Sequence, residues 1–295
     1  MAPRKTGNVT SITPTRSTRY VALSNHKGGV GKTTTAMNLA GALVLKERKV
    51  LVIDMDPQCN ASIAFNIAIP KNEPGVRHLL KEAPLPLSQC IYECGPYCDL
   101  IPADVGLADL QSELLQGPKA RTRLRERLKS CEGKYDFVLI DCPPSLDMLT
   151  VNALIAASSV LIPIQCEYFA LEGVSELVET VHQIRKARNP TLGIEGVLLT
   201  MFDDRTNLSH QVMDDLKQFF GKRVFSTIIP RNIRLGEAPS HGRPILLYDI
   251  KSKGAEAYIR LAKEILHGTE KGVGTGFERP VGNDSGSRSG SASRD

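Results

Sequence analysis

Short apolar runs alternate with longer amphipathic stretches between residues 20 and 267 of this chain. The runs of Val, Ile and Leu predict buried strands at residues 20–25, 50–54, 100–101, 137–141, 160–164 and 194–200. The intervening stretches predict helices, most clearly at residues 121–129, 171–186, 208–220 and 255–266. Because strands that are apolar throughout are typical of parallel sheets covered on both faces, the pattern predicts an α/β fold with a doubly wound, mostly parallel sheet.

The two ends of the chain lack this pattern. Residues 1–19 are rich in Thr, Ser, Arg and Pro and predict a disordered basic arm, and residues 268–295 predict a disordered Gly/Ser-rich tail. The folded domain is then residues 20–267. Since no apolar run reaches the roughly 18–20 residues of a membrane helix and the N-terminus lacks a secretion signal, we expect a cytoplasmic protein with no membrane partner.

A glycine-rich loop follows the first predicted strand and leads into a helix that we expect to run to about residue 46. The loop contains Gly28, Gly29, Val30, Gly31, Lys32, Thr33 and Thr34. Glycines let the backbone turn its N–H groups toward phosphate oxygens, and the helix N-terminus adds the positive end of its dipole. In such a loop Lys32 reaches the β- and γ-phosphates and the Thr33 hydroxyl is a ligand for Mg²⁺.

The loop departs from the standard phosphate-loop motif at its start. The motif G-x-x-x-x-G-K-[ST] would place glycine where this chain has His26, and an additional lysine, Lys27, follows it. A glycine-rich turn without a ligand is the alternative, but a pair of lysines at a turn has no packing purpose. We therefore interpret the segment as a phosphate loop of the deviant Walker type.

Two aspartate-bearing segments end predicted strands near this loop. Asp54 and Asp56 close the second strand, and Asp141 ends the strand at residues 137–141. A carboxylate at such a strand end can hold Mg²⁺, directly or through water. Each aspartate alone could equally cap a helix or a turn, but the phosphate loop favours the functional interpretation.

Positive charge is concentrated late in the chain. The formal net charge is +5, and residues 183–253 carry 12 Lys/Arg against 7 Asp/Glu, whereas residues 20–182 carry 15 against 19. The late segment includes Arg231, Arg243, Lys251 and Lys253. Such an excess suggests a polyanionic partner, with a solvated surface as the alternative on charge alone.

Five motifs, in order, resemble those of the ParA/Soj family of chromosome and plasmid partitioning ATPases: K-G-G-V-G-K-T-T, D-M-D-P-Q, F-V-L-I-D-C-P-P-S, E-Y-F-A-L-E-G and I-P-R-N-I-R-L-G-E-A-P-S-H-G. The resemblance implies a P-loop NTPase fold and an ATPase that uses ATP and Mg²⁺. It also implies a homodimer formed with ATP, non-specific binding to nucleoid DNA, and a ParB-type centromere-binding protein that stimulates hydrolysis.

The resemblance assigns roles around the phosphates. Lys27 resembles the family's signature lysine, which reaches the partner's phosphates across the dimer, and Lys32 resembles the lysine that acts within its own protomer. Thr33 is implied as a Mg²⁺ ligand and Asp141 as the Walker B carboxylate. Asp56 resembles the residue that positions the attacking water.

Further roles lie later in the chain. Pro230 and Asn232 resemble residues that flank the adenine. Arg205 and Arg234 match arginines that the family uses for DNA binding, which extends the candidate DNA surface suggested by the charge distribution.

Two positions depart from the family pattern. Cys59 stands after D-M-D-P-Q, where the family usually has glycine, and Asp147 stands at a second position that is usually glycine. Neither is in the phosphate loop. We expect Cys59 to alter the flexibility of the segment that carries Asp56.

Other classes of protein share the variant loop. A MinD-like positioning ATPase would need a C-terminal amphipathic helix, which residues 268–295 do not predict. An iron protein of the nitrogenase type would need a cluster-ligating cysteine, and Cys142 lies between Asp141 and prolines, the wrong context. A bacterial tyrosine kinase would carry C-terminal tyrosines, and residues 268–295 have none. A scaffold switched by ATP without hydrolysis stays open, with Asp56 arguing against it.

Three of the seven cysteines, Cys90, Cys94 and Cys98, are spaced four apart. Their spacing invites a metal or redox site, but Gly95 and Pro96 interrupt any helix that would align them. Since the odd cysteine count fits a reducing compartment, structural thiols are the favoured interpretation.

Overall fold

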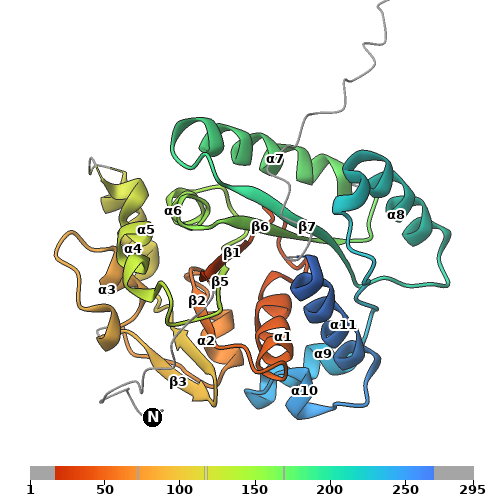
Figure 1. The fold of residues 1–295 in the computed structure, drawn as a ribbon, viewed down its shortest axis with the longest axis horizontal. Helices are drawn as coiled ribbons and strands as arrows, with labels where there is room; N and C mark the ends of the chain where they lie inside the picture. The colour runs from red at the N-terminus through yellow and green to blue at the C-terminus, as the bar shows by residue number, and fades with distance from the viewer. Residues whose placement is uncertain (1–16, 72, 116, 118, 169, 269–295) are drawn as a thin grey trace, which may run out of the picture.

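A mostly parallel sheet forms the centre of the molecule (Figure 1). The computed structural model describes residues 17–71, 73–115, 117, 119–168 and 170–268. Within them the strands are β1 (Arg19–Leu23), β2 (Val50–Asp54), β3 (Tyr92–Gly95), β4 (Cys98–Ile101), β5 (Phe137–Asp141), β6 (Ser159–Gln165) and β7 (Gly193–Thr200). Their spatial order is β3-β4-β2-β5-β1-β6-β7, and only the β3–β4 pair among them is antiparallel.

Helices cover both faces of the sheet, so its two faces pack into separate apolar clusters. One face packs against α1 (Lys32–Val44), α9 (Ile233–Glu237), α10 (Ile245–Tyr248) and α11 (Lys253–Gly268). The other packs against α3 (Val76–Leu80), α4 (Leu107–Leu114), α5 (Arg123–Leu128), α6 (Met148–Ala156), α7 (Ala170–Ala187) and α8 (Asn207–Phe220). A short helix, α2 (Asn60–Ala64), follows β2. No helix in the described part of the chain is long and apolar enough to cross a membrane.

The predicted fold class is confirmed, and the longer predicted elements lie within two residues of the observed ones. All five residues of β2 and of β5 are buried, which is why both strands appear as unbroken apolar runs. The apolar pattern did not reveal α6, because most of its residues are buried and it therefore lacks a polar face. The antiparallel strand β3 was also missed; it carries exposed residues at a sheet edge.

The boundaries at the two ends need a small correction. Thr18 and Arg19, which we assigned to the arm, belong to the fold: the Thr18 hydroxyl donates to the Tyr135 carbonyl at 2.8 Å, and Arg19 begins β1. Gly268 ends α11. Residues 1–16 of the predicted arm and 269–295 of the predicted tail lie outside the described residues.

Candidate nucleotide-binding site

The phosphate loop connects the end of β1 to the start of α1. Gly29 and Gly31 have φ angles of 76° and 87°, in the left-handed region that glycine adopts without strain. A Cβ built on Gly29 would meet no neighbouring atom of the described residues within 4 Å, so a side chain would fit there. The need for glycine at this position therefore comes from its backbone conformation. The loop is therefore shaped by its own sequence, as the motif predicts.

Neighbouring strands hold the loop in place. The Thr200 hydroxyl, at the end of β7, donates to the Val30 carbonyl at 2.9 Å. Asn25 accepts from the Lys27 backbone N–H at 3.1 Å, while its amide donates to the Pro163 carbonyl at 2.8 Å. These contacts fix the loop at the carboxyl edge of the sheet, where doubly wound folds bind ligands.

The two lysines of the loop differ in direction. Lys32 is 6% exposed, and its ammonium donates to the Lys27 carbonyl at 3.0 Å. Burial lowers the Lys32 pKa, and the nearby Asp141 carboxylate opposes that shift. The Lys27 ammonium instead pairs with the Glu167 carboxylate, and these side chains remain 38% and 43% exposed. The Lys32 ammonium thus lies inside the loop, and the Lys27 ammonium lies outside it.

A buried carboxylate completes a cation site beside the loop. Asp141 lies opposite Asp54 in the β2–β5 pairing, and its Oδ2 accepts from the Thr33 hydroxyl at 2.7 Å. Its Oδ1 is buried and has no hydrogen-bond partner among the described residues. Burial raises the pKa of Asp141 well above its usual range, the Asp54 charge adds to that, and the Thr33 hydrogen bond and Lys32 oppose it.

The oxygen donors at this position fit Mg²⁺. An unpartnered, buried carboxylate oxygen is costly to leave unsatisfied, and a divalent cation would both bind it and offset the crowded negative charge. A carboxylate and a hydroxyl are the hard oxygen ligands that Mg²⁺ prefers. Asp141 and Thr33 would therefore hold the metal ion, as the sequence predicts.

Asp54 anchors the segment that carries Asp56. Its Oδ2 accepts from the Ser62 N–H at 2.8 Å and the Ser62 hydroxyl at 2.6 Å, and its Oδ1 accepts from the Asp56 N–H at 3.0 Å. Burial raises the Asp54 pKa to about 6, opposed by these hydrogen bonds. Asp56 is 7% exposed, and its Oδ1 accepts from the Gln58 N–H at 2.9 Å.

The structure shows how the backbone accommodates each departure from the family pattern. Cys59 precedes α2 with a φ angle of 58°, so the usual glycine fits a backbone conformation that strains other residues. Asp147 has an extended φ of −86°, where glycine is not needed, and its Oδ1 accepts from the Leu149 and Thr150 N–H groups at the start of α6. The aspartate therefore gives α6 an N-cap.

The two residues assigned to the adenine lie beside the strand that supports the loop. Pro230 forms an isolated parallel bridge with Phe202, which follows β7. Asn232 caps α9 by accepting from the Arg234 N–H at 2.9 Å. Thr200, at the end of β7, contacts the phosphate loop, and Phe202 follows it by two residues. The end of β7 therefore links Pro230 and Asn232 to the phosphate loop.

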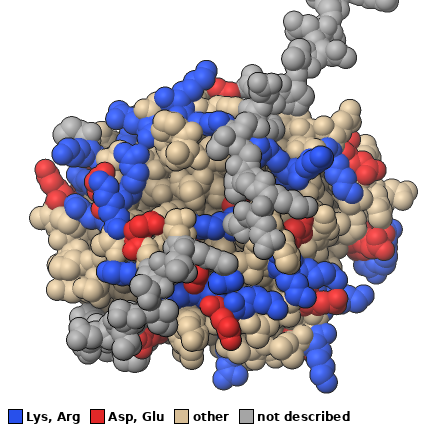
Figure 2. Space-filling view, in the orientation of Figure 1, with Lys and Arg blue, Asp and Glu red and all other residues tan. Residues whose placement is uncertain are grey.

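The six basic residues of the candidate DNA surface, Arg205, Arg231, Arg234, Arg243, Lys251 and Lys253, are all exposed. Two connections join their segments. The Arg231 N–H donates to the Phe202 carbonyl at 2.9 Å, which brings it beside the loop that carries Arg205. The Arg234 guanidinium lies 3.7 Å from Asp249, two positions before Lys251. In the view of Figure 2, Lys and Arg side chains gather in the lower part, over α9, α10 and α11, with carboxylates among them.

Several residues of this region were not identified from the sequence. Asn25, Thr200 and Ser62 act through hydrogen bonds to other segments, and Glu167 pairs with Lys27 across 140 positions of sequence. Glu167 lies in the motif E-Y-F-A-L-E-G, so the motif was noticed but the contact was not. Among the described residues no group of three or more side chains is placed to hold a metal through His, Cys, Asp or Glu, and no disulfide joins any of the seven cysteines.

The fold and the loop define the class of protein to which this chain belongs, the P-loop ATPases. A family model described as an AAA domain matches residues 18–194. A solved structure of cobyrinic acid a,c-diamide synthase from Mycobacterium smegmatis, with bound ATP analog and magnesium, superimposes with a TM-score of 0.76. It is 33% identical, and the match covers 86% of this chain and 96% of that one. ATP and Mg²⁺ are the cofactors for which the site is built.

The nearer sequence relatives are partitioning proteins. The chain is 47% identical over 252 residues to the chromosome partitioning protein ParA of Myxococcus xanthus (strain DK1622), covering 84% of this chain and 88% of the relative. It is also 47% identical over 247 residues to the sporulation initiation inhibitor protein Soj of Bacillus subtilis (strain 168), covering 84% and 98%. The chain belongs to the ParA/Soj family of partitioning ATPases.

Proposed function

We propose that this protein hydrolyses ATP as a dimer, binds DNA without reading its sequence, and partitions chromosomal or plasmid DNA with a ParB-type centromere-binding partner. The observation that carries the proposal is the division between the two lysines of the phosphate loop. Lys32 is buried within its own site, whereas the Lys27 ammonium pairs with Glu167 and is partly exposed. A lysine in that position is available to a second protomer.

The residues of the site divide the work of phosphoryl transfer. The loop N–H groups and Lys32 bind the phosphates, and Asp56 orients the attacking water. Thr33 and Asp141 hold Mg²⁺, which supplies charge neutralisation at the β- and γ-phosphates. Lys27 reaches the partner's phosphates and acts as an arginine finger does, because phosphoryl transfer depends mostly on positioning and charge neutralisation. Pro230 and Asn232 flank the adenine.

ATP binding then controls DNA binding through dimerisation. One protomer offers few phosphate contacts, whereas a dimer presents two copies of the basic surface together. Phosphate contacts act jointly through counterion release, so affinity should fall steeply with salt and ignore base sequence. Hydrolysis stimulated by the partner would return the protein to monomers and release it from the nucleoid.

A titration of fluorescent duplex DNA tests this function directly. Binding is measured with ATP, with ADP and without nucleotide, at several salt concentrations. We expect tight binding only with ATP, with a log–log salt slope that drops by about one for each phosphate contact removed. Arg205→Glu and Arg234→Glu should weaken binding while ATP-driven dimerisation persists.

Arg260→Glu is the matched control for those charge reversals. Arg260 is also exposed and also pairs with a carboxylate, Glu256, at 2.9 Å, but it lies two turns along α11 from Lys253 and is not one of the six residues of the proposed surface. Equal DNA affinity in all three nucleotide states would refute the ATP switch. Equal losses in all three arginine variants would show that net charge, rather than this surface, controls binding.

A further inference from the structure

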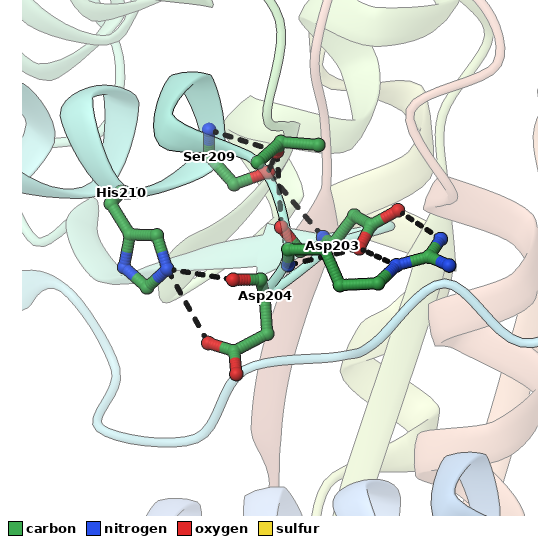
Figure 3. Close-up of polar contacts among 6 residues, drawn as sticks. Asp203, Asp204, Ser209 and His210 are labelled. Atoms are coloured by element: carbon green, nitrogen blue, oxygen red, sulfur yellow. Dashed lines mark hydrogen bonds and ion pairs between the residues drawn. The ribbon is translucent and has the colours of Figure 1, made fainter.

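Both arginines assigned to DNA contact are already occupied by carboxylates of the same protomer. Arg205 is 87% exposed, yet its guanidinium makes two parallel hydrogen bonds to Asp203: Nε to Oδ1 at 2.9 Å and Nη2 to Oδ2 at 2.7 Å. Figure 3 shows this two-point pairing beside the neighbouring pair of Asp204 and His210. The edge of the guanidinium that carries Nε and Nη2 is therefore closed to a phosphate, which would otherwise bind it with the same two-point geometry.

The loop after β7 holds the Asp203 carboxylate in this position. The Oδ1 of Asp203 also accepts from the Arg205 backbone N–H at 3.1 Å, and the Asp203 backbone carbonyl accepts from the Thr206 N–H at 3.1 Å. Thr206 in turn caps α8. The Arg205 hydrogen bonds hold the Asp203 pKa at about 2, so the carboxylate is anionic at every pH at which the protein would work.

Arg234 has the same arrangement on a different element. Its Nη1 donates to Glu237 Oε2 at 2.9 Å, one turn along α9, and its Nε lies 3.7 Å from Asp249 Oδ2. The Tyr248 hydroxyl donates to the same Glu237 oxygen at 3.1 Å, which orients the carboxylate. For Arg231, Arg243, Lys251 and Lys253, by contrast, no carboxylate within the described ranges lies at ion-pair distance.

We propose that Asp203 and Glu237 are intramolecular competitors of DNA phosphate, which set the affinity of the DNA surface by occupying Arg205 and Arg234 in the free protein. This inference rests on the proposed DNA-binding function. A phosphate that binds the occupied N–H groups must displace the carboxylate, and one that binds the remaining N–H groups meets its negative charge, so the gain per contact is smaller than for an unpaired arginine. The anionic carboxylate that is displaced also stays close to the DNA and repels it.

The consequence is a stronger dependence on dimerisation. When each contact is weak, a single protomer binds DNA poorly, and two linked copies of the surface gain affinity through their high effective concentration. Competition by Asp203 and Glu237 would therefore keep the ADP-bound monomer off DNA without preventing the ATP dimer from binding.

Asp203→Asn tests the inference, with Asp204→Asn as the matched control. Both variants remove one negative charge at adjacent positions, although Asp203 is 23% exposed and Asp204 89%, and Asp204 pairs with His210 at 3.4 Å rather than with an arginine. Asparagine retains an oxygen that accepts from the Arg205 N–H, so the loop should keep its shape. We expect Asp203→Asn to tighten ATP-dependent DNA binding by about two- to fivefold relative to Asp204→Asn, the range expected for an exposed ion pair.

A double variant shows whether the effect passes through Arg205. In an Arg205→Gln background the Asp203→Asn change should tighten binding no more than Asp204→Asn does. Glu237→Gln is a second variant on a separate helix, compared with Glu256→Gln, and should show the same gain. In the ADP state the combination of Asp203→Asn and Glu237→Gln should bind DNA measurably more tightly than the wild type.

The outcomes separate this inference from the function on which it rests. If the wild type fails to bind DNA with ATP, both the proposed function and the inference are wrong. If the wild type binds with ATP but Asp203→Asn behaves like Asp204→Asn, and Glu237→Gln like Glu256→Gln, only the competition is refuted. A gain that persists without Arg205 would also overturn it, because charge alone would then explain the effect.

Discussion

Replacing Lys27 by alanine should separate nucleotide binding from hydrolysis. Its ammonium contacts Glu167, outside the phosphate loop, while Lys32 keeps the buried position inside the loop. The Lys27 backbone N–H is held by Asn25, a contact that alanine preserves. We therefore expect Lys27→Ala to bind ATP as a monomer and to lose ATP-driven dimerisation and turnover.

Lys27→Ala should change the free energy of unfolding little and the rate of ATP hydrolysis greatly. The Lys27–Glu167 pair is 38% and 43% exposed, so solvent screening limits its contribution to the free energy of unfolding to well under about 1 kcal/mol. A cationic group supplied in trans contributes about 10³- to 10⁵-fold to the rate of phosphoryl transfer in related P-loop enzymes. Turnover should thus fall by at least about 10³-fold with little change in the melting temperature.

Mixing two inactive variants distinguishes a trans lysine from a cis lysine. In a mixed dimer of Lys27→Ala and Asp56→Ala, the Lys27→Ala protomer has its own Asp56 and receives Lys27 from its partner, so one of the two sites is complete. Random pairing of equal amounts would give at most about one quarter of the wild-type rate, because no more than about half of the dimers are mixed and a mixed dimer has only one Lys27 to hold it together. Lys32→Ala mixed with Asp56→Ala is the control that should stay inactive, since neither protomer then holds both residues of its own site.

The ATPase rate of the mixture shows whether Lys27 acts in trans or in cis. Activity no higher than the sum of the separate variants, measured at protein concentrations at which size-exclusion chromatography shows that mixed dimers form, would refute the trans assignment. Full dimerisation of Lys27→Ala on size-exclusion chromatography with ATP, together with normal hydrolysis, would refute it independently.

Three further predictions concern the segments around the site. Asp56→Ala should keep ATP binding and accumulate as an ATP-bound dimer on size-exclusion chromatography; unchanged turnover would discard its role in positioning water. Asp141→Asn should reduce the additional thermal stabilisation that Mg²⁺ gives with ATP, while the protein without ligand melts no lower, because a buried negative charge is removed; an undiminished Mg²⁺ effect would place the ion elsewhere. Cys59→Gly should raise the free energy of unfolding by up to about 1 kcal/mol in urea titrations, and Cys59→Val should lower it, because the φ angle is 58°; equal stabilities would show that the backbone there relaxes.

Local chemistry explains how much of the site could be predicted from the sequence. The phosphate loop is contiguous, and its glycines are required by the φ angles of their own backbone, so the motif predicts both the loop and the helix that follows it. Likewise β2 and β5 are buried on both faces, which leaves an unbroken apolar run followed by aspartate. Since parallel strands share a carboxyl edge, the sequence also predicts that Asp54 and Asp141 lie near each other, as their register shows.

Contacts between distant segments were decided only by the tertiary structure. Thr33 and Asp141 meet across 108 positions, and the oxygen of Asp141 that is left without a partner became visible only when every neighbour was in place. The pairing of Lys27 with Glu167 depends on how β6 and the phosphate loop lie side by side. Even the local Asp203–Arg205 pair could not be predicted, because an exposed side chain can contact either solvent or a neighbouring side chain. The backbone geometry of the loop after β7 determines that Arg205 contacts Asp203.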